Sequence, residues 1–418
     1  MMWSIDMKMA WRNIWRNPRR TMLTILAIAF ACVLLIFMLS FQFGSYDTMI
    51  NASVKIHTGH LQVQARDYRD NQEIRHVIPD PRPVQQALDA IPEVKAHAPR
   101  ARSFALVSSE ERSYGVMVEG VEPAAEAHVS TLAGIIRQGH YLEDQPREDA
   151  MPHALIGHLL ARNLKVTIGD ELTVLGQGLD GSIAATVLRV WGIYNSGMDA
   201  FDRGAIQIPL DAFQEIFAMG TAVHEIVIVG RRLADVPAIE AALNTPLTRI
   251  PTQRPLDVLD WEELMPGLRQ AISMDLVSGS IFYLILIMVV AFSILNTFLM
   301  AILERTYEFG VMMAVGAKPG RLTRLVLAES VGMTLVGVIT GMVLGCLVTW
   351  YFMHHGISLA GSSEVLRQFG IPSRLYPRLT PISTTAGPLA VFVVTLLAAL
   401  YPALKIRRLQ PVEAMRQR

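Results

Sequence analysis

Uncharged apolar segments divide the chain into one early run, a long polar stretch of over two hundred residues, and three late runs. The segments are Thr21–Tyr46, Leu276–Leu303, Ser330–Ser363 and Leu379–Leu404. Each contains about 20 consecutive, mostly apolar residues, the length that a helix needs to cross the hydrocarbon core of a bilayer. We therefore predict four membrane helices and one large domain between the first two. The helices are expected at 21–44, 276–303, 321–350 and 385–404, and the domain at 45–275.

The large domain shows the periodicities of a mixed α+β fold. Strand-like runs are Leu61–Ala65, Gly115–Val121, Glu171–Leu175, Ala185–Ile193, Ala205–Ile208 and Glu225–Val229. Helical spacing connects Val84, Leu88 and Ile91, and again Val236, Ile239 and Leu243. A strand followed by a helix at each end of the domain predicts two βα units, with a strand-rich sub-lobe formed by the middle. The expected fold is a four-helix membrane protein with a two-lobed α+β domain inserted between helices one and two.

Charge sets the predicted orientation. Residues 1–20 and 404–418 each hold five basic residues and one acidic residue, and the loop 304–324 holds Arg305, Lys318, Arg321 and Arg324. Short basic loops stay in the cytoplasm, so we place the tail 405–418 there and the loop 351–384 outside. The domain 45–275 then lies in the periplasm of a bacterial inner membrane. Residues 44–276 hold 20 basic and 31 acidic residues, but long loops do not follow the charge rule.

Composition agrees with a membrane protein and argues against several kinds of site. Hydrophobic residues make up 51% of the chain and charged residues 18%, against about 25% in soluble domains. Both cysteines, Cys32 and Cys346, lie in predicted membrane helices, so the domain has no disulfide. No phosphate-binding G-x-x-x-x-G-K-[ST] motif occurs, and the histidines form no metal-ligand pattern. We expect no enzyme activity, metal, cofactor or nucleic-acid partner for this chain.

The N-terminal segment 1–20 has the pattern of an amphipathic helix on the cytoplasmic surface. Met7, Trp11, Ile14 and Trp15 fall on one face, and Lys8, Arg12 and Arg16 recur on another. Pro18 is expected to end this helix before the first crossing.

The segment 304–320 predicts a short cytoplasmic helix with an apolar stripe. Tyr307, Val311 and Val315 repeat every four residues with Met312 alongside, Gly316 is a natural helix end, and Pro319 stops continuation. Such a stripe is explained if the helix docks into a groove on a cytoplasmic partner, and the alternative is a helix resting on lipid headgroups. The candidate coupling residues are Glu304, Arg305, Tyr307, Glu308, Val311, Met312, Val315 and Gly316.

The third membrane helix carries Gly337, Gly341 and Gly345 at a four-residue spacing. Overlapping G-x-x-x-G patterns let another helix approach closely, although glycine is also common in membrane helices. Glu329 is expected in the first turn or two of this helix, where its carboxylate can reach the interface or pair with an arginine.

These motifs resemble those of the FtsX-like and MacB-type permease subunits of ABC transporters, most of all the lipoprotein-releasing (LolC/LolE-like) permeases. The resemblance covers the whole chain and rests on seven motifs: Ala10–Ile14, Leu155–Ala161, Val166–Asp170, Gly192–Met198, Glu304–Lys318, Tyr401–Ala403 and Leu409–Arg416. The segment Arg19–Leu26 is closer to the general permease pattern than to that of dedicated lipoprotein releasers.

The resemblance implies mechanotransmission. Two copies of a separate cytoplasmic ATPase, which bind ATP and magnesium, would act through the 304–315 helix on the membrane helices and the periplasmic domain. A second permease copy or a homologue completes such a transporter, with a periplasmic carrier or adaptor as a further partner. Three functions stay open: extraction of lipoprotein or other lipid-anchored cargo from the outer leaflet, tripartite efflux, and FtsX-type signalling to a periplasmic enzyme.

Overall fold

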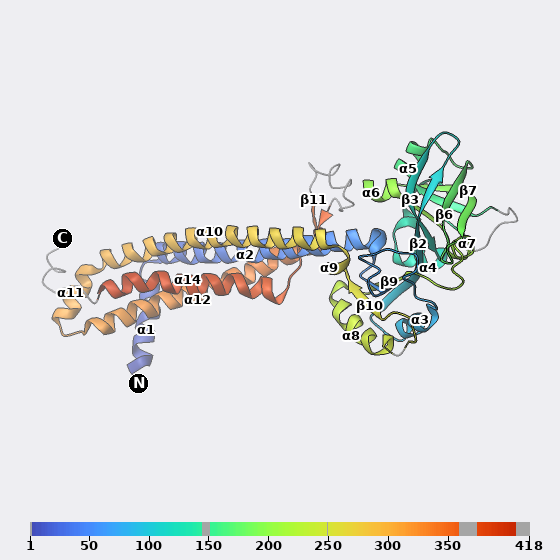
Figure 1. Cartoon of the computed structure of the whole chain (residues 1–418). Helices are drawn as coiled ribbons and strands as arrows, with labels where there is room; N and C mark the ends of the chain where they lie inside the picture. Colours follow the sequence, from blue (N-terminus) through green and yellow to red (C-terminus); the bar gives the residue numbers. More distant parts are fainter. Residues whose placement is uncertain (1, 144–150, 249, 359–373, 407–418) are drawn as a thin grey trace. The chain divides into compact units, whose positions relative to one another are not determined.

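The computed structural model describes residues 2–143, 151–248, 250–358 and 374–406, with side chains from Lys8 onward. The chain forms two compact units (Figure 1). The helical unit contains Met1–Tyr46, Ala271–Ser358 and Arg374–Arg418, and the sheet unit contains Asp47–Gln270 and Leu359–Ser373. Much of the predicted loop 351–384, and the Leu409–Arg416 motif in the predicted tail, lie outside the described residues.

Four long apolar helices dominate the helical unit, as the four apolar runs of the sequence predict. They are α2 (Pro18–Ser53), α10 (Pro266–Glu304), α12 (Pro319–His355) and α14 (Pro381–Lys405), and each is long and apolar enough to cross a membrane. Figure 1 shows them side by side. A shared core holds them together, with Ile28 and Leu35 from α2, Phe298 from α10, Val338 from α12 and Val391 from α14.

Three shorter features complete the described part of the helical unit. Helix α1 (Met2–Ile14) packs along α12, where a Cβ on Gly332 would lie 2.8 Å from Ile14 Cδ1. Helix α11 (Thr306–Ala314) connects α10 to α12, and β11 (Ile357–Ser358) pairs antiparallel with β12 (Arg374–Leu375). The corner between α1 and α2 falls at Trp15–Asn17, because Pro18 occupies the first position of α2.

One ten-stranded sheet organises the other unit. Its strands are β1 (Leu61–Ala65), β2 (Val94–Ser108), β3 (Ser113–Val121), β4 (Ile136–Gly139), β5 (His153–Gly157), β6 (Glu171–Gln177), β7 (Ile183–Tyr194), β8 (Ala205–Pro209), β9 (Glu225–Gly230) and β10 (Leu256–Asp260). The spatial order is β10-β1-β9-β2-β3-β8-β5-β7-β4, with β6 pairing both β2 and β7. The β3–β8 and β5–β7 pairs are parallel and the others are antiparallel.

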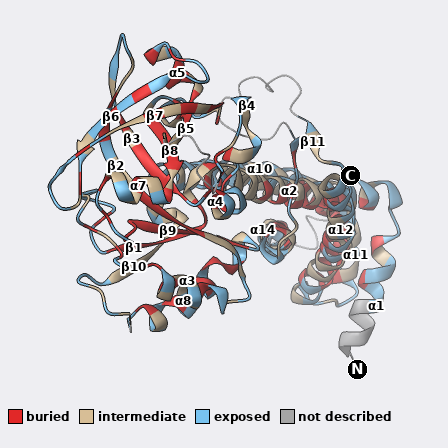
Figure 2. Ribbon diagram, turned by 90° about the vertical axis from the view of Figure 1, so that its right-hand side faces the viewer, coloured by how far each residue is buried: buried red, intermediate tan, exposed pale blue. Residues whose placement is uncertain are grey.

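Helices cover this sheet on two sides. They are α3 (Arg82–Asp89), α4 (Pro123–Val129), α5 (His158–Leu164), α6 (Asp199–Gly204), α7 (Leu210–Ile216), α8 (Val236–Leu247) and α9 (Trp261–Leu264). The largest apolar core contains side chains of α3, α5, α7 and α8, and a smaller one joins α4 to Ala98 of β2 and Val227 of β9. Figure 2 shows the buried residues running along the strands.

Two lobes share this sheet. In the first, β1 pairs with β9 and α3 packs against α8, so segments from both ends of the unit meet. The second contains β3 to β8 with α5 to α7. Strand β2 belongs to both: its first half pairs with β9, and its second half with β3 and β6. The 15 residues of β2 therefore connect the lobes without a loop.

Candidate functional site

Helix α11 presents one buried face and one exposed face. Phe309 and Met313 are buried in a cluster with Ile302 of α10, Leu322 of α12 and Ala403 of α14. On the other side, Tyr307 is 53% exposed, Val311 38% and Val315 86%. The three stripe residues thus face away from the chain's own core, while Met312 is partly buried against it.

The end of α11 is set by glycine. Gly316 adopts a φ of +103°, which L side chains rarely accept. Its N–H donates to the carbonyl of Met313 (3.0 Å), and the N–H of Ala317 donates to that of Met312 (2.9 Å). These bonds satisfy carbonyls left open at the helix end. Helix α11 ends at Ala314, so Val315 lies just beyond its last residue, and Pro319 begins α12.

Glu329 lies at the centre of a charged cluster formed by four helices. Its Oε2 accepts a hydrogen bond from Arg305 Nη1 (2.8 Å), and its Oε1 accepts one from Asn13 Nδ2 (2.6 Å). The carboxylate therefore connects α12 to α1 and to the junction of α10 and α11. The expected position of Glu329 in the first turn or two of the helix is wrong. Because α12 already begins at Pro319, Glu329 lies about three turns in.

Further ion pairs extend this cluster to the corner between α1 and α2. Arg20 pairs with Glu304 (2.6 Å), Arg16 pairs with Glu308, and Arg305 also reaches Glu308 (3.4 Å). Burial by itself would raise the pKa of Glu308, but the guanidinium groups of Arg16 and Arg305 outweigh it and hold that pKa below its usual value. Three carboxylates thus meet three guanidinium groups at one end of the helical unit.

Burial distinguishes the Arg305–Glu329 ion pair from the more exposed ion pairs of the cluster. The side chains of Arg305 and Glu329 are 17% and 10% exposed, whereas Arg16 and Glu304 are 54% and 46% exposed. Exposed pairs contribute about 0–1 kcal/mol, but removing one partner of a buried pair costs several times more. The Arg305–Glu329 pair is therefore the fixed point of the cluster.

The structure divides the predicted coupling residues into two groups. Glu304, Arg305 and Glu308 are engaged in ion pairs within the chain, and Tyr307, Val311 and Val315 are exposed. Sequence reasoning did not include Asn13, Arg16 or Arg20 in this site. It considered Glu329 separately, with an arginine as one possible partner, and the structure shows Arg305 in that role. A usable signal was present, because the three acidic residues near this end of the helices need basic partners in a low-dielectric setting.

The glycines of α12 lie against α2. A Cβ on Gly337 would approach Ile28 Cβ at 2.8 Å, and one on Gly341 would approach the Ala29 carbonyl oxygen and Cys32 Cβ at 2.6 Å. At Gly345 the nearest atoms belong to Ile36. This contact lies within one chain, and it allows the two helix backbones to approach more closely than any side chain would permit.

A second polar cluster lies in the sheet unit, where α2 ends. A π-helical turn, Val54–Thr58, follows α2, and its His57 reaches a buried row of charged side chains on one face of the sheet. Arg100 of β2 is fully buried and donates to both carboxylate oxygens of Glu126 (2.9 and 2.7 Å) and to the carbonyl of His57 (2.6 Å). Arg102 pairs with Glu119 (3.1 Å) and with Glu225 (3.0 Å).

The His57 imidazole fits this row as a neutral ring. Burial, together with Arg100 and Arg102, lowers its pKa more than Glu119 raises it. Nε2 lies 3.1 Å from Glu119 Oε1, and Nδ1 lies 3.2 Å from Arg100 Nη1. Nε2 also contacts Arg102 Nη2, so the ring connects both arginines with Glu119. These contacts fix the turn after α2 to strands β2 and β3.

Within the described ranges, no group of three or more His, Cys, Asp or Glu side chains is arranged to hold a metal ion. Ser196 and His158 both contact Asp202, at 2.6 and 3.0 Å, so aspartate is the central member of that group. A serine nucleophile needs the histidine in the central position.

Comparison with known families agrees with the two-unit architecture. A model described as "MacB-like periplasmic core domain" matches residues 21–245, which is more than half of the chain. A model described as "FtsX-like permease C-terminal" matches residues 280–411. The first match spans α2 and the sheet unit up to residue 245, and the second spans most of α10 together with α12 and α14.

Curated relatives are transport proteins. The lipoprotein-releasing system transmembrane protein LolC of Xylella fastidiosa is 24% identical over 339 residues, covering 78% of each chain. The pyoverdine export ATP-binding/permease protein PvdT of Pseudomonas syringae is 26% identical and covers 97% of this chain and 58% of the relative. The macrolide export ATP-binding/permease protein MacB of Rhodospirillum rubrum is 24% identical and covers 98% of this chain and 60% of the relative.

Among solved structures, the periplasmic region of MacB from Actinobacillus actinomycetemcomitans is similar, with 11% identity and a TM-score of 0.36, covering 52% of this chain and 94% of that chain.

Proposed function

Because the chain belongs to the MacB-like family of ABC transporter permeases, with an FtsX-like C-terminal region, we propose that it converts ATP hydrolysis on a partner subunit into movement of its sheet unit. In this proposal the four long helices cross a bacterial inner membrane. The sheet unit is inserted between the first and second of them and lies in the periplasm. Two cytoplasmic ATPase subunits, which bind ATP and magnesium, and a second permease copy or a homologue complete the transporter.

The charged cluster around Glu329 is the observation that carries the mechanism. Four helices, α1, α10, α11 and α12, meet there, and α2 joins them through the Arg20–Glu304 pair. A load applied to the exposed stripe of α11 is passed to Arg305 at the start of that helix. It then reaches α12 through Glu329 and α1 through Asn13. Because these contacts are short and partly buried, the helices move together rather than independently.

The buried row around Arg100 supports the second half of the proposal. Helix α2 begins beside the charged cluster at Pro18, and the turn that follows it is bonded to β2 through the carbonyl of His57. A displacement of α2 along its axis therefore acts on the sheet through Arg100. No step in this route needs cargo to pass between the membrane helices.

The cargo we propose is lipoprotein or another lipid-anchored molecule taken from the outer leaflet. This rests on the LolC relatives, which match 78% of their own length. The second candidate is export through a tripartite pump, which the MacB and PvdT relatives favour because they align with nearly the whole of this chain. A lipoprotein carrier among the periplasmic partners would favour the first, and an adaptor the second.

Co-purification from membranes in mild detergent tests the coupling proposal. Tyr307→Asp places a charge on the exposed stripe of α11, and we expect it to remove most of the co-purifying ATPase while leaving membrane insertion unchanged. The matched control, Tyr307→Phe, keeps the apolar ring and should retain the ATPase. Retention by the aspartate variant would overturn the assignment of α11 as the docking helix.

Reconstitution separates the two cargo proposals. The chain and its co-purifying ATPase are placed in liposomes that contain a fluorescent triacylated lipoprotein, and ATP is added. ATP-dependent appearance of the lipoprotein on a soluble carrier supports extraction. Hydrolysis without such release, combined with an adaptor in the purified complex, supports efflux.

A further inference from the structure

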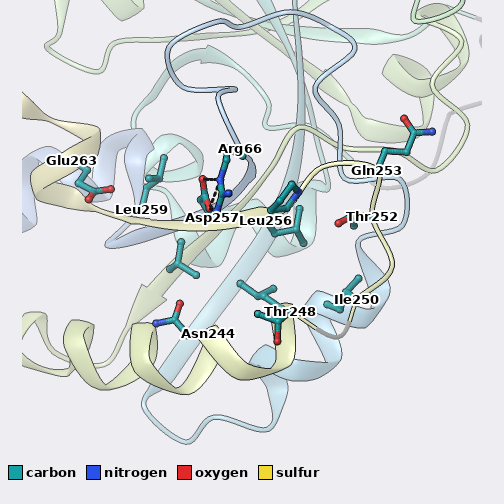
Figure 3. Close-up of a pocket in the computed structure, with 13 residues that line it drawn as sticks. Arg66, Asn244, Thr248, Ile250, Thr252, Gln253, Leu256, Asp257, Leu259 and Glu263 are labelled. Carbon is teal, nitrogen blue, oxygen red and sulfur yellow. Dashed lines mark hydrogen bonds and ion pairs between the residues drawn. The ribbon is translucent and has the colours of Figure 1, made fainter.

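The strand β10 has a free edge beside a groove in the sheet unit. It ends the sheet and pairs only with β1 among the described strands. Along its other side runs a groove of about 860 Å³. Figure 3 shows β10 on one side of this groove and α8 on the other, with the segment 250–255 closing one end.

The register of the β1–β10 pair shows which backbone groups point into the groove. The N–H of Arg66 donates to the carbonyl of Pro255 (2.9 Å), so residues 66 and 255 form a hydrogen-bonded pair. Such pairs alternate along an antiparallel ladder. Leu256 and Val258 then direct their N–H and C=O groups away from β1. Within the described residues these groups meet no further strand, and they can accept one.

The walls of the groove suit a single extended chain. Leu247 of α8 and Leu256 and Val258 of β10 belong to or pack against the main apolar core, so they give the groove an apolar floor. Asn244 and Thr248 are exposed on α8 and line the facing wall. The groove lies between the free edge of β10 and helix α8, so it has room for one added strand but not for the edge of a second sheet. A second copy of this chain, which would bring its own sheet, fits less well.

One end of the groove is acidic. Glu263 of α9 lines the groove, and its N–H donates to the carboxylate of Asp260 at the end of β10 (2.9 Å). Glu240 of α8 lies near both carboxylates. Burial, and then the charges of Asp260 and Glu263, raise the pKa of Glu240. At the other end, Arg66 donates to both oxygens of Asp257 (2.8 to 3.3 Å), so that charge is already compensated. A positive group on a ligand would be favoured at the first end and not at the second.

We propose that this groove binds an extended peptide segment of a partner protein as an added strand on β10, with a lysine or arginine of that segment at the acidic end. Main-chain hydrogen bonds to Leu256 and Val258 supply affinity, and alternate side chains enter the apolar floor. The site is separate from the ATPase-docking stripe of α11 and does not depend on the transported cargo.

Selection from a phage-displayed library of linear seven-residue peptides, against the full chain in detergent, tests this proposal. The enriched peptides are then synthesised with a fluorescent label, and their dissociation constants are measured by anisotropy. We expect β-branched residues at alternate positions and a basic residue near one end. Val258→Pro removes the N–H that points into the groove while leaving the ladder to β1 intact, so it should weaken binding about tenfold or more. Val258→Thr keeps that N–H and is the matched control.

Further measurements keep the test informative if the proline variant folds poorly. Single backbone nitrogens of the selected peptide are then methylated, one position per peptide. Methylation at every second position should abolish binding to the unmodified chain, and methylation at the positions between should leave it unchanged. Glu240→Gln combined with Glu263→Gln should reduce the preference for a basic residue severalfold.

Failure to enrich any peptide, equal binding to Val258→Pro and Val258→Thr, or no effect of methylation would each overturn the proposal. A change in the number of copies per complex in Val258→Pro would identify a second copy as the occupant instead. ATPase co-purification should be unaffected throughout, so this result is distinguishable from failure of the coupling proposal.

Discussion

At the residue scale, Glu329 connects three parts of the helical unit, although in the sequence it is only one acidic residue beside an apolar run. It is a single carboxylate next to a long apolar run, and its side chain is 10% exposed. In this setting Arg305 and Asn13 both donate hydrogen bonds to its carboxylate. One residue of α12 thus holds two other parts of the chain in place.

Glu329→Gln is predicted to destabilise the helical unit. Glutamine keeps the size of the side chain but removes the charge that compensates the partly buried Arg305, at a cost of about 1–3 kcal/mol. Thermal unfolding of the purified chain in detergent measures this as a lower midpoint. The matched control is Glu304→Gln, which breaks an exposed pair and should change stability by about 0.5 kcal/mol or less. Equal midpoints for the two variants would contradict the central role of Glu329.

Sequence reasoning recognised parts of the candidate site and missed how they connect. The stripe of Tyr307, Val311 and Val315 follows from helical spacing, and all three side chains are exposed. Spacing does not show which charges are paired over 24 residues, as for Arg305 and Glu329, or over 316 residues, as for Asn13 and Glu329. Those contacts depend on how the helices pack. Whether the stripe docks on an ATPase stays a prediction.

At the scale of elements, the glycine face of α12 sets the distance to α2. A methyl group at Gly341 would lie 2.6 Å from a backbone oxygen, a contact that neither helix can relieve by rotating a side chain. Packing at this point is therefore fixed by backbone against backbone.

Gly341→Ala is predicted to separate α12 from α2 and to lower stability by about 1–3 kcal/mol, the usual cost of overpacking. Gly320 provides the matched control in the same helix, because a Cβ there meets nothing within 4 Å. Gly320→Ala should leave stability unchanged or raise it slightly, since alanine favours a helix. Thermal unfolding of both variants makes the comparison, and a Gly341→Ala chain as stable as Gly320→Ala would show that α2 and α12 do not need this close approach.

Six of the ten strands of the sheet were predicted, and β2, β4, β5 and β10 were not. All six predicted strand segments fall within strands of the sheet. Strand β2 was missed because Pro99, Arg100 and Arg102 interrupt its apolar pattern. In the structure those arginines are buried and paired, so polar residues occupy positions where alternation predicts apolar ones. The predicted helix at Val84–Ile91 ends earlier, at Asp89, because the residue before Pro92 avoids helical geometry.

At the scale of the whole molecule, the proposed topology places the two units in different compartments. The basic N-terminal segment and the basic residues near α11 favour the cytoplasm for that end of the helices. The sheet unit then faces the periplasm.

Cysteine labelling checks this topology. In a chain with Cys32 and Cys346 replaced by alanine, Ser182→Cys lies in the turn between β6 and β7, and Lys318→Cys lies just before α12. A membrane-impermeant maleimide added to sealed spheroplasts should modify Cys at position 182 at once and at position 318 only after lysis. Each site serves as the control for the other, and the reverse pattern would overturn the orientation.

The shared strand β2 limits how the sheet unit can deform. Its backbone continues from one lobe into the other at Arg100, a residue with no exposed surface. Drawing the lobes apart as rigid bodies would stretch covalent bonds and break the ladder at that point. Rotation of neighbouring strands about β2 keeps the hydrogen bonds, because sheets adopt a wide range of twist. A force on either lobe is therefore converted into torsion about one strand, and the covalent chain carries it to the other lobe without any hinge.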